Sequence, residues 1–134
     1  MNYWLVKSEP GSYSWDEFVK DKTTDWTGVR NYGARNNLQA MKKGDLVFFY
    51  HSLEGLKIMG IGKVVKESFY DPTTENPAWV AVTLKAEKKL KNPVALKDLK
   101  ADHRLKDMAL IKNTRLSVQP VKPSEWEIIM QYAG

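Results

Sequence analysis

Short apolar runs, most of them too brief for helices, dominate the hydrophobic pattern of this sequence. They either alternate with polar residues or run continuously, and β-branched and aromatic residues are frequent in them, as is typical of strands. The pattern predicts strands over residues 3–7, 46–50, 58–69, 79–84 and 115–121. Gly60 and Gly62 interrupt the longest of these, which indicates a bulge or a close approach of another segment.

Helical patterns occupy the stretches between these strands. Ser14 and Glu17 have the spacing of a capping box, so a short helix is expected to follow Ser14 and end near residue 20. Residues 31–41 place three apolar side chains on one face, which predicts a second helix. One or two short helices are expected within 94–106, and Pro123 opens a last one.

The order of these elements bears on the fold class. Strands and helices mix without regular βαβ alternation, which predicts an α+β fold in which several strands curl into a small barrel surrounded by helices. Residues 21–28 and 71–77 are expected to be loops. A length of 134 residues indicates one domain over 1–134.

Composition and charge narrow the function classes. The sequence has no cysteine, which excludes disulfides and thiolate zinc sites. Its start has no basic leader followed by a long apolar run, so we expect a cytoplasmic protein. The net charge of +5 favours an anionic partner, of which nucleic acid is the commonest, but it also suits an ordinary basic protein. Five tryptophans are present, and one or two of them are expected to line a pocket rather than the core.

Signatures of catalysis are sparse. His51 and His103 are the only histidines, and neither has a partner at metal-ligand spacing. No nucleophile elbow or phosphate-binding glycine loop is present. A pair such as His51 and Ser52 stays open, because catalytic triads assemble in space rather than in sequence. We therefore expect a protein that is not an enzyme and that uses no cofactor or metal.

The stretch from Trp26 to residue 37 is the richest in binding chemistry. Arg30 and Asn31 fall at the start of the predicted second helix, where Asn31 suits the N-cap, and Arg35 lies one turn later. Arginines favour phosphate, asparagines can read a base edge, and a tryptophan offers a stacking face. The same residues can instead satisfy loop carbonyls and fill the core, and the sequence leaves both interpretations open.

Three other segments carry candidate groups, each with a functional and a structural interpretation. Residues 7–10 and 50–52 end predicted strands, where polar side chains either face a cleft or mark an ordinary transition to a loop. The lysine-rich span from Lys85 to Lys106 is either a phosphate-tracking surface or a solvated face.

Taken in order, these motifs resemble the EVE domain family. The resemblance covers nearly the whole sequence and rests on residues 3–10, 13–15, 26–36, 44–52, 70–72, 77–79 and 115–121. It implies the PUA-like fold shared with PUA, YTH and ASCH domains, which is a partly open, mixed β-barrel of about five to six strands surrounded by short helices.

The resemblance also implies a function and a set of site residues. It implies a non-catalytic module, expected to be a monomer, that reads a modified base, in DNA rather than RNA and on cytosine in particular. The alternatives are a hydrolase, or a protein that binds a free modified nucleoside in the same pocket. The residues expected to line the pocket are Trp26, Arg30, Asn31, Arg35, Ser8, Glu9, Tyr50, His51 and Ser52.

Overall fold

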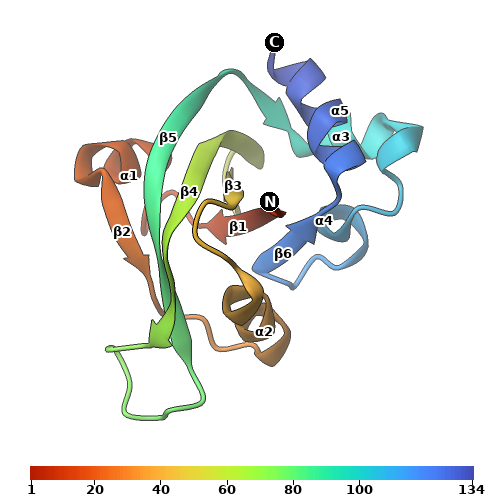
Figure 1. Ribbon diagram of the computed structural model, residues 1–134. Coiled ribbons are helices and arrows are strands. Elements are labelled where there is room, and N and C mark those ends of the chain that lie inside the picture. The colour runs from red at the N-terminus through yellow and green to blue at the C-terminus, as the bar shows by residue number, and fades with distance from the viewer.

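A single strongly curved sheet of six strands forms the centre of the molecule (Figure 1). The computed structural model describes residues 1–134. The strands are β1 (Tyr3–Ser8), β2 (Thr23–Trp26), β3 (Leu46–His51), β4 (Lys57–Tyr70), β5 (Val80–Ala95) and β6 (Val118–Val121). Their order in the sheet is β2-β5-β4-β3-β1-β6, and β1 and β3 are the one parallel pair. The two edge strands, β2 and β6, do not pair with each other, so the barrel is open. This confirms the expected mixed, partly open architecture.

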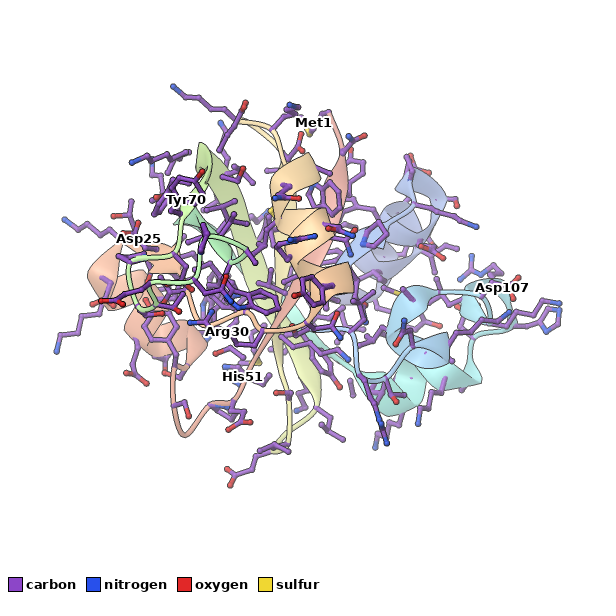
Figure 2. The ribbon with its side chains drawn as sticks, turned by 90° about the horizontal axis from the view of Figure 1, so that it is seen from below. Met1, Asp25, Arg30, His51, Tyr70 and Asp107 are labelled. Carbon is purple, nitrogen blue, oxygen red and sulfur yellow. The ribbon has the colours of Figure 1, made fainter.

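Short helices surround this sheet (Figure 1), and Figure 2 shows the same ribbon from below with its side chains. They are α1 (Trp15–Asp21), α2 (Tyr32–Ala40), α3 (Leu96–Ala101), a 3₁₀ turn (His103–Leu105), α4 (Ala109–Lys112) and α5 (Pro123–Ala133). None of the helices is both long enough and apolar enough to cross a lipid bilayer.

The predicted helix caps are confirmed. The Ser14 hydroxyl accepts the Glu17 N–H at 3.1 Å, and the Glu17 carboxylate accepts the Ser14 N–H at 3.1 Å, which completes the capping box of α1. The Asn31 side chain accepts the Ala34 N–H at 3.0 Å and caps α2.

Three predicted boundaries are wrong. Residues 23–26, expected in a loop, form the edge strand β2, which pairs with β5 from Thr23 opposite Lys85 to Trp26 opposite Val82. β5 continues to Ala95, so helix begins only at residue 96. The predicted strand 115–121 shrinks to 118–121. In each case long-range pairing, which local propensity does not report, decides where the strand lies.

The sheet is buried on both faces, which explains its continuous apolar strands. On β3, Val47 and Phe49 belong to a core cluster that includes residues of α1 and α2, whereas Phe48 and Tyr50 belong to the opposite cluster, which includes residues of α3 and α5. Alternating side chains therefore all enter one core or the other.

Gly60 and Gly62 have the role that the sequence indicates. Between Ile58 and Gly60, the register of β4 shifts against both neighbouring strands, β3 and β5, as expected for a bulged strand. The Trp15 ring lies directly against Gly60, where a Cβ atom would come within 2.4 Å of the ring. At Gly62, a Cβ atom would approach the Lys85 carbonyl oxygen at 3.2 Å.

Candidate functional site

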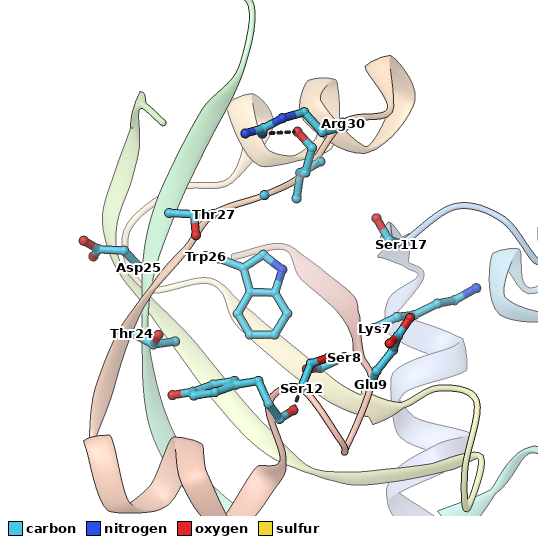
Figure 3. Close-up of a pocket in the computed structure, with 13 residues that line it drawn as sticks. Lys7, Ser8, Glu9, Ser12, Thr24, Asp25, Trp26, Thr27, Arg30 and Ser117 are labelled. Carbon is cyan, nitrogen blue, oxygen red and sulfur yellow. Dashed lines mark hydrogen bonds between the residues drawn. The ribbon is translucent and has the colours of Figure 1, made fainter. Parts of the chain in front are cut away.

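A cavity of about 410 Å³ opens between β2 and the end of β1 (Figure 3). Its volume falls within the ~300–1,000 Å³ range of small-molecule pockets. Four of the nine predicted site residues line it, namely Trp26, Arg30, Ser8 and Glu9. The other lining residues are Lys7, Ser12, Tyr13, Thr24, Asp25, Thr27, Gly28, Val29 and Ser117.

Trp26 stands in the middle of this cavity, between the β2 wall and the wall formed by residues 7–9 (Figure 3). Its ring makes edge-type contacts with Phe49, at 5.7 Å between centroids, and with Tyr13, at 6.4 Å. These contacts fix the indole while part of it stays exposed, and its N–H donates no hydrogen bond within the protein. The cavity therefore contains a fixed aromatic surface with a free donor.

The end of β1 supplies the opposite wall. The Ser8 hydroxyl donates to the Tyr13 carbonyl at 2.5 Å, and the Lys7 ammonium donates to the Thr114 carbonyl at 2.8 Å. Burial lowers the pKa of Lys7. The Glu9 backbone carbonyl accepts the Ser12 and Tyr13 N–H groups at 2.9 and 2.8 Å. Its exposed carboxylate makes no hydrogen bond or ion pair, so it is free to accept from a ligand.

A buried carboxylate, Asp71, holds the rim around Arg30. One of its oxygens accepts the Gly28 N–H at 2.8 Å and the Arg30 guanidinium at 2.9 Å. The other accepts the Thr73 N–H at 2.7 Å and the Thr73 hydroxyl at 2.6 Å. Burial alone would raise the pKa of Asp71, but the hydrogen bonds from Thr73, Gly28 and Arg30 outweigh it and lower the pKa well below its usual range. This single carboxylate joins the segment after β2 to the loop after β4.

The predicted residues on and before α2 divide between two places. Arg30 lines the cavity, but Asn31 faces a neighbouring cleft. Arg35 does not line the cavity either, because its guanidinium donates to the Ala78 carbonyl at 3.2 Å and to Asn36 at 2.8 Å. It also lies over the Tyr32 ring, 4.9 Å from the centroid.

The predicted residues at the end of β3 lie behind the cavity wall. Tyr50 is 3% exposed and points into the opposite core, because it alternates with Phe49, which packs against Trp26. His51 accepts the Trp15 N–H at 3.0 Å, and burial lowers its pKa although Asp16 opposes the shift. Ser52 donates its backbone N–H to the Ser8 carbonyl at 2.9 Å.

Several lining residues were not predicted as site residues. Thr24 and Asp25 were missed because residues 21–28 were expected to be a loop, and only the pairing of β2 with β5 brings them to the wall. Asp71 does not line the cavity but holds its rim, and no local pattern links it to Arg30 and Gly28, which lie 41 and 43 positions earlier. No group of three or more His, Cys, Asp or Glu residues is arranged to hold a metal ion.

Comparison with known proteins gives a family and close structural relatives. The EVE domain profile matches residues 2–132. Thymocyte nuclear protein 1 of Rattus norvegicus is 37% identical over an alignment of 163 positions, which covers 96% of this chain and 72% of that protein. Protein Atu2648 of Agrobacterium tumefaciens has a crystal structure with a TM-score of 0.98 and 45% identity, covering 100% of this chain and 94% of that one.

Two further solved structures contain bound nucleic acid. The human THYN1 protein, in complex with DNA containing 5-methylcytosine, superposes with a TM-score of 0.92 at 33% identity and covers 99% of this chain and 98% of that one. The YTH domain of Zygosaccharomyces rouxii MRB1, in complex with N6-methyladenosine RNA, has a TM-score of 0.63 at 13% identity, covers 98% of this chain and 86% of that one, and shows a shared fold alone.

These relatives also correct one expectation. The sequence was expected to belong to a cytoplasmic protein, and this is wrong: the curated relatives from Rattus norvegicus, Homo sapiens and Mus musculus are named as nuclear proteins. A leader distinguishes secreted from non-secreted proteins, so this criterion carries no information on the nucleus. The match over residues 2–132 and the 37% identity to thymocyte nuclear protein 1 establish that the chain belongs to the EVE domain family.

Proposed function

We propose that this protein is a non-catalytic reader that binds DNA by taking one modified cytosine into the cavity around Trp26. The observation that carries the proposal is a fixed, partly exposed indole inside a polar-walled cavity of about 410 Å³. Support also comes from human THYN1, a protein of the same fold at 33% identity that was solved with DNA containing 5-methylcytosine.

Stacking on Trp26 supplies the part of the affinity that does not depend on the base. A base stacked on an aromatic side chain gains about 1–3 kcal/mol, whichever base it is. A base taken from a duplex must first be flipped out, which costs a few kcal/mol. Affinity for duplex DNA is therefore expected to be modest and salt-dependent, and higher for single strands or mismatched sites.

The free polar groups of the cavity supply selectivity. The Glu9 carboxylate is placed to accept from the exocyclic amine of cytosine, which uracil and thymine lack. The Trp26 indole N–H and the Ser117 hydroxyl make no hydrogen bond within the protein. Both are therefore available to bind the other polar groups on the edge of the base. A buried methyl group adds only about 0.8 kcal/mol, so discrimination against unmodified cytosine requires a better shape fit as well.

The remaining predicted site residues have supporting roles in this proposal. Arg30 lies at the rim, 39% exposed, where its charge faces an incoming phosphate while Asp71 holds its position. His51 and Ser52 support the wall through Trp15 and Ser8, and Tyr50 supports it from the opposite core. Asn31 and Arg35 lie beyond the rim.

A fluorescence titration tests the proposal. Short DNA and RNA oligonucleotides would carry cytosine, 5-methylcytosine, 5-hydroxymethylcytosine or N6-methyladenine at one position, at two salt concentrations. We expect tryptophan quenching of the wild type with a modified cytosine in DNA. Fluorescence anisotropy of a dye-labelled oligonucleotide, which does not depend on the protein's tryptophans, should show loss of binding in Trp26→Ala and partial retention in Trp26→Phe. Trp126→Phe, which changes a tryptophan of the opposite core outside the cavity, serves as the matched control. Binding that ignores the modification, or that survives in Trp26→Ala, contradicts the proposal.

A second candidate, hydrolysis of a modified nucleoside, rests on Lys7 and Glu9. Both line the cavity, and the lowered pKa of Lys7 favours acid–base chemistry. Incubation with modified nucleosides, followed by chromatography, distinguishes the two functions. A released base or altered nucleoside, lost in Glu9→Gln, would replace the reader by a hydrolase.

A further inference from the structure

We propose that a second cleft, beside the base cavity, binds the sugar–phosphate backbone of the nucleotide next to the inserted base. The cleft has a volume of about 470 Å³ and lies between α2 and the segment that leads from α4 to β6. Its lining includes Asn31, Asn36, Asn37, Asn113, Arg115 and Leu116. The inference rests on the proposed function, because it assigns the path of the strand whose base enters the cavity.

The two hollows are neighbours along the chain at two separate points. Arg30 lines the base cavity and Asn31 lines the cleft, while Ser117 lines the base cavity and Leu116 lines the cleft. Consecutive Cα atoms are about 3.8 Å apart, so the ridge between the hollows is one residue thick on each side. A nucleotide adjoining the inserted base therefore has a short path over this ridge into the cleft.

Most of the groups that remain free in the cleft are hydrogen-bond donors, and the Asn37 oxygen is a free acceptor because the Asn37 NH₂ group donates to the Val118 carbonyl at 2.7 Å. The oxygen of Asn31 accepts the Ala34 N–H, and the oxygen of Asn36 accepts from Arg35, so both asparagines keep a free NH₂ group. Arg115 is exposed and makes no hydrogen bond or ion pair. No carboxylate lines the cleft. One unpaired guanidinium beside neutral amide donors suits a phosphate, which accepts from all of them.

The lysine-rich part of β5 is a less suitable path. Lys85, Lys88 and Lys89 border a different hollow, against Trp15 and Val19 beside α1. That hollow shares no lining residue with the base cavity, and Glu87 also lines it. A strand that followed these lysines would have to cross α1 or β2 to reach Trp26.

Charge-removing variants test the assignment. Arg115→Gln and the charge reversal Arg115→Glu would be compared with Lys97→Gln, an exposed residue of α3 that lines neither hollow, and with Lys88→Gln. Two ligands are titrated: a single-stranded DNA oligonucleotide carrying 5-methylcytosine, over a series of salt concentrations, and the free nucleoside 5-methyl-2′-deoxycytidine. Circular dichroism and thermal unfolding confirm that each variant is folded.

Arg115→Gln is expected to weaken oligonucleotide binding roughly 3- to 10-fold at low salt and to reduce the salt slope by about 0.7, the value for one lost phosphate contact on a single strand. Arg115→Glu is expected to weaken it further. The affinity for the nucleoside stays at the wild-type level in both Arg115 variants. Lys97→Gln leaves the affinity for both ligands unchanged.

Two results overturn the inference. One is an unchanged salt slope in Arg115→Gln and Arg115→Glu, and the other is a loss in Lys88→Gln that exceeds the loss at Arg115. Either result leaves the reader function standing as long as the wild type prefers modified cytosine. If the wild type shows no preference for a modified base in either ligand, the proposed function itself fails, so the two failures are distinguishable.

Discussion

Replacing Asp71 with asparagine tests the clamp that holds the cavity rim. The asparagine has the same shape, but an NH₂ group replaces the oxygen that accepts from Gly28 and Arg30. Two charge-assisted hydrogen bonds are lost, and the new NH₂ group then faces the Gly28 N–H and the Arg30 guanidinium, which are also donors. Each such bond contributes roughly 1.5–3 kcal/mol. Because Arg30 is 39% exposed, water replaces part of its loss. We expect the free energy of unfolding to fall by about 2–3 kcal/mol at pH 7.

The pH dependence gives this prediction a sign. Hydrogen bonds lower the pKa of Asp71 in the folded protein below the value of about 3.9 expected in the unfolded chain. A depressed carboxyl pKa stabilises the protein above the unfolded pKa, and this contribution is lost as pH falls toward the folded pKa. The difference between wild type and Asp71→Asn should therefore be constant from pH 7 to about 5 and shrink below about pH 4.

Urea unfolding followed by tryptophan fluorescence measures both quantities. Asp98→Asn is the matched control, since Asp98 is an exposed carboxylate with no side-chain hydrogen bond, and it should stay within about 0.5 kcal/mol of the wild type. The reasoning is refuted if Asp71→Asn also stays within that range, or if its effect persists unchanged at pH 3.

Two further predictions concern the packing and the start of α1. Gly60→Ala should lower the free energy of unfolding by about 1–3 kcal/mol or more, because the new methyl group collides with Trp15, whereas Gly11→Ala, with no atom within 4 Å, should have little effect in the same urea titration. Equal stability of the two glycine variants would contradict the close approach. Ser14→Ala should cost about 1 kcal/mol through the lost cap, measured by thermal unfolding, and Ser14→Asp should restore most of it.

Local patterns predicted those parts of the fold that local interactions determine. The capping box of α1 and the N-cap of α2 lie within three residues of their partners, so the sequence reveals them. β2 has no such signal. It is a four-residue edge strand whose existence depends on pairing with β5, about sixty residues away in the sequence, and propensity does not encode that pairing.

The candidate site was predicted in part for the same reason. Trp26 and Glu9 line the cavity as expected, but Tyr50 does not, because β3 is buried on both faces and its apolar run does not reveal which face carries which residue. Asp71 could not be found from spacing, since its partners are 41 and 43 residues away and meet it only in the folded chain.

The Asp71 clamp also bears on how this loop can change in evolution. Asp71 and Trp79 are joined by a backbone hydrogen bond of 3.1 Å, and Thr73 is fixed by the same carboxylate, so the loop is closed at its base. Residues 74–77 form the tip beyond that closure, and the entropy of closing a loop rises only slowly with its length. Insertions or deletions at the tip can therefore accumulate in descendants of this sequence without displacing Arg30, which leaves the tip free to diversify while the rim is inherited intact.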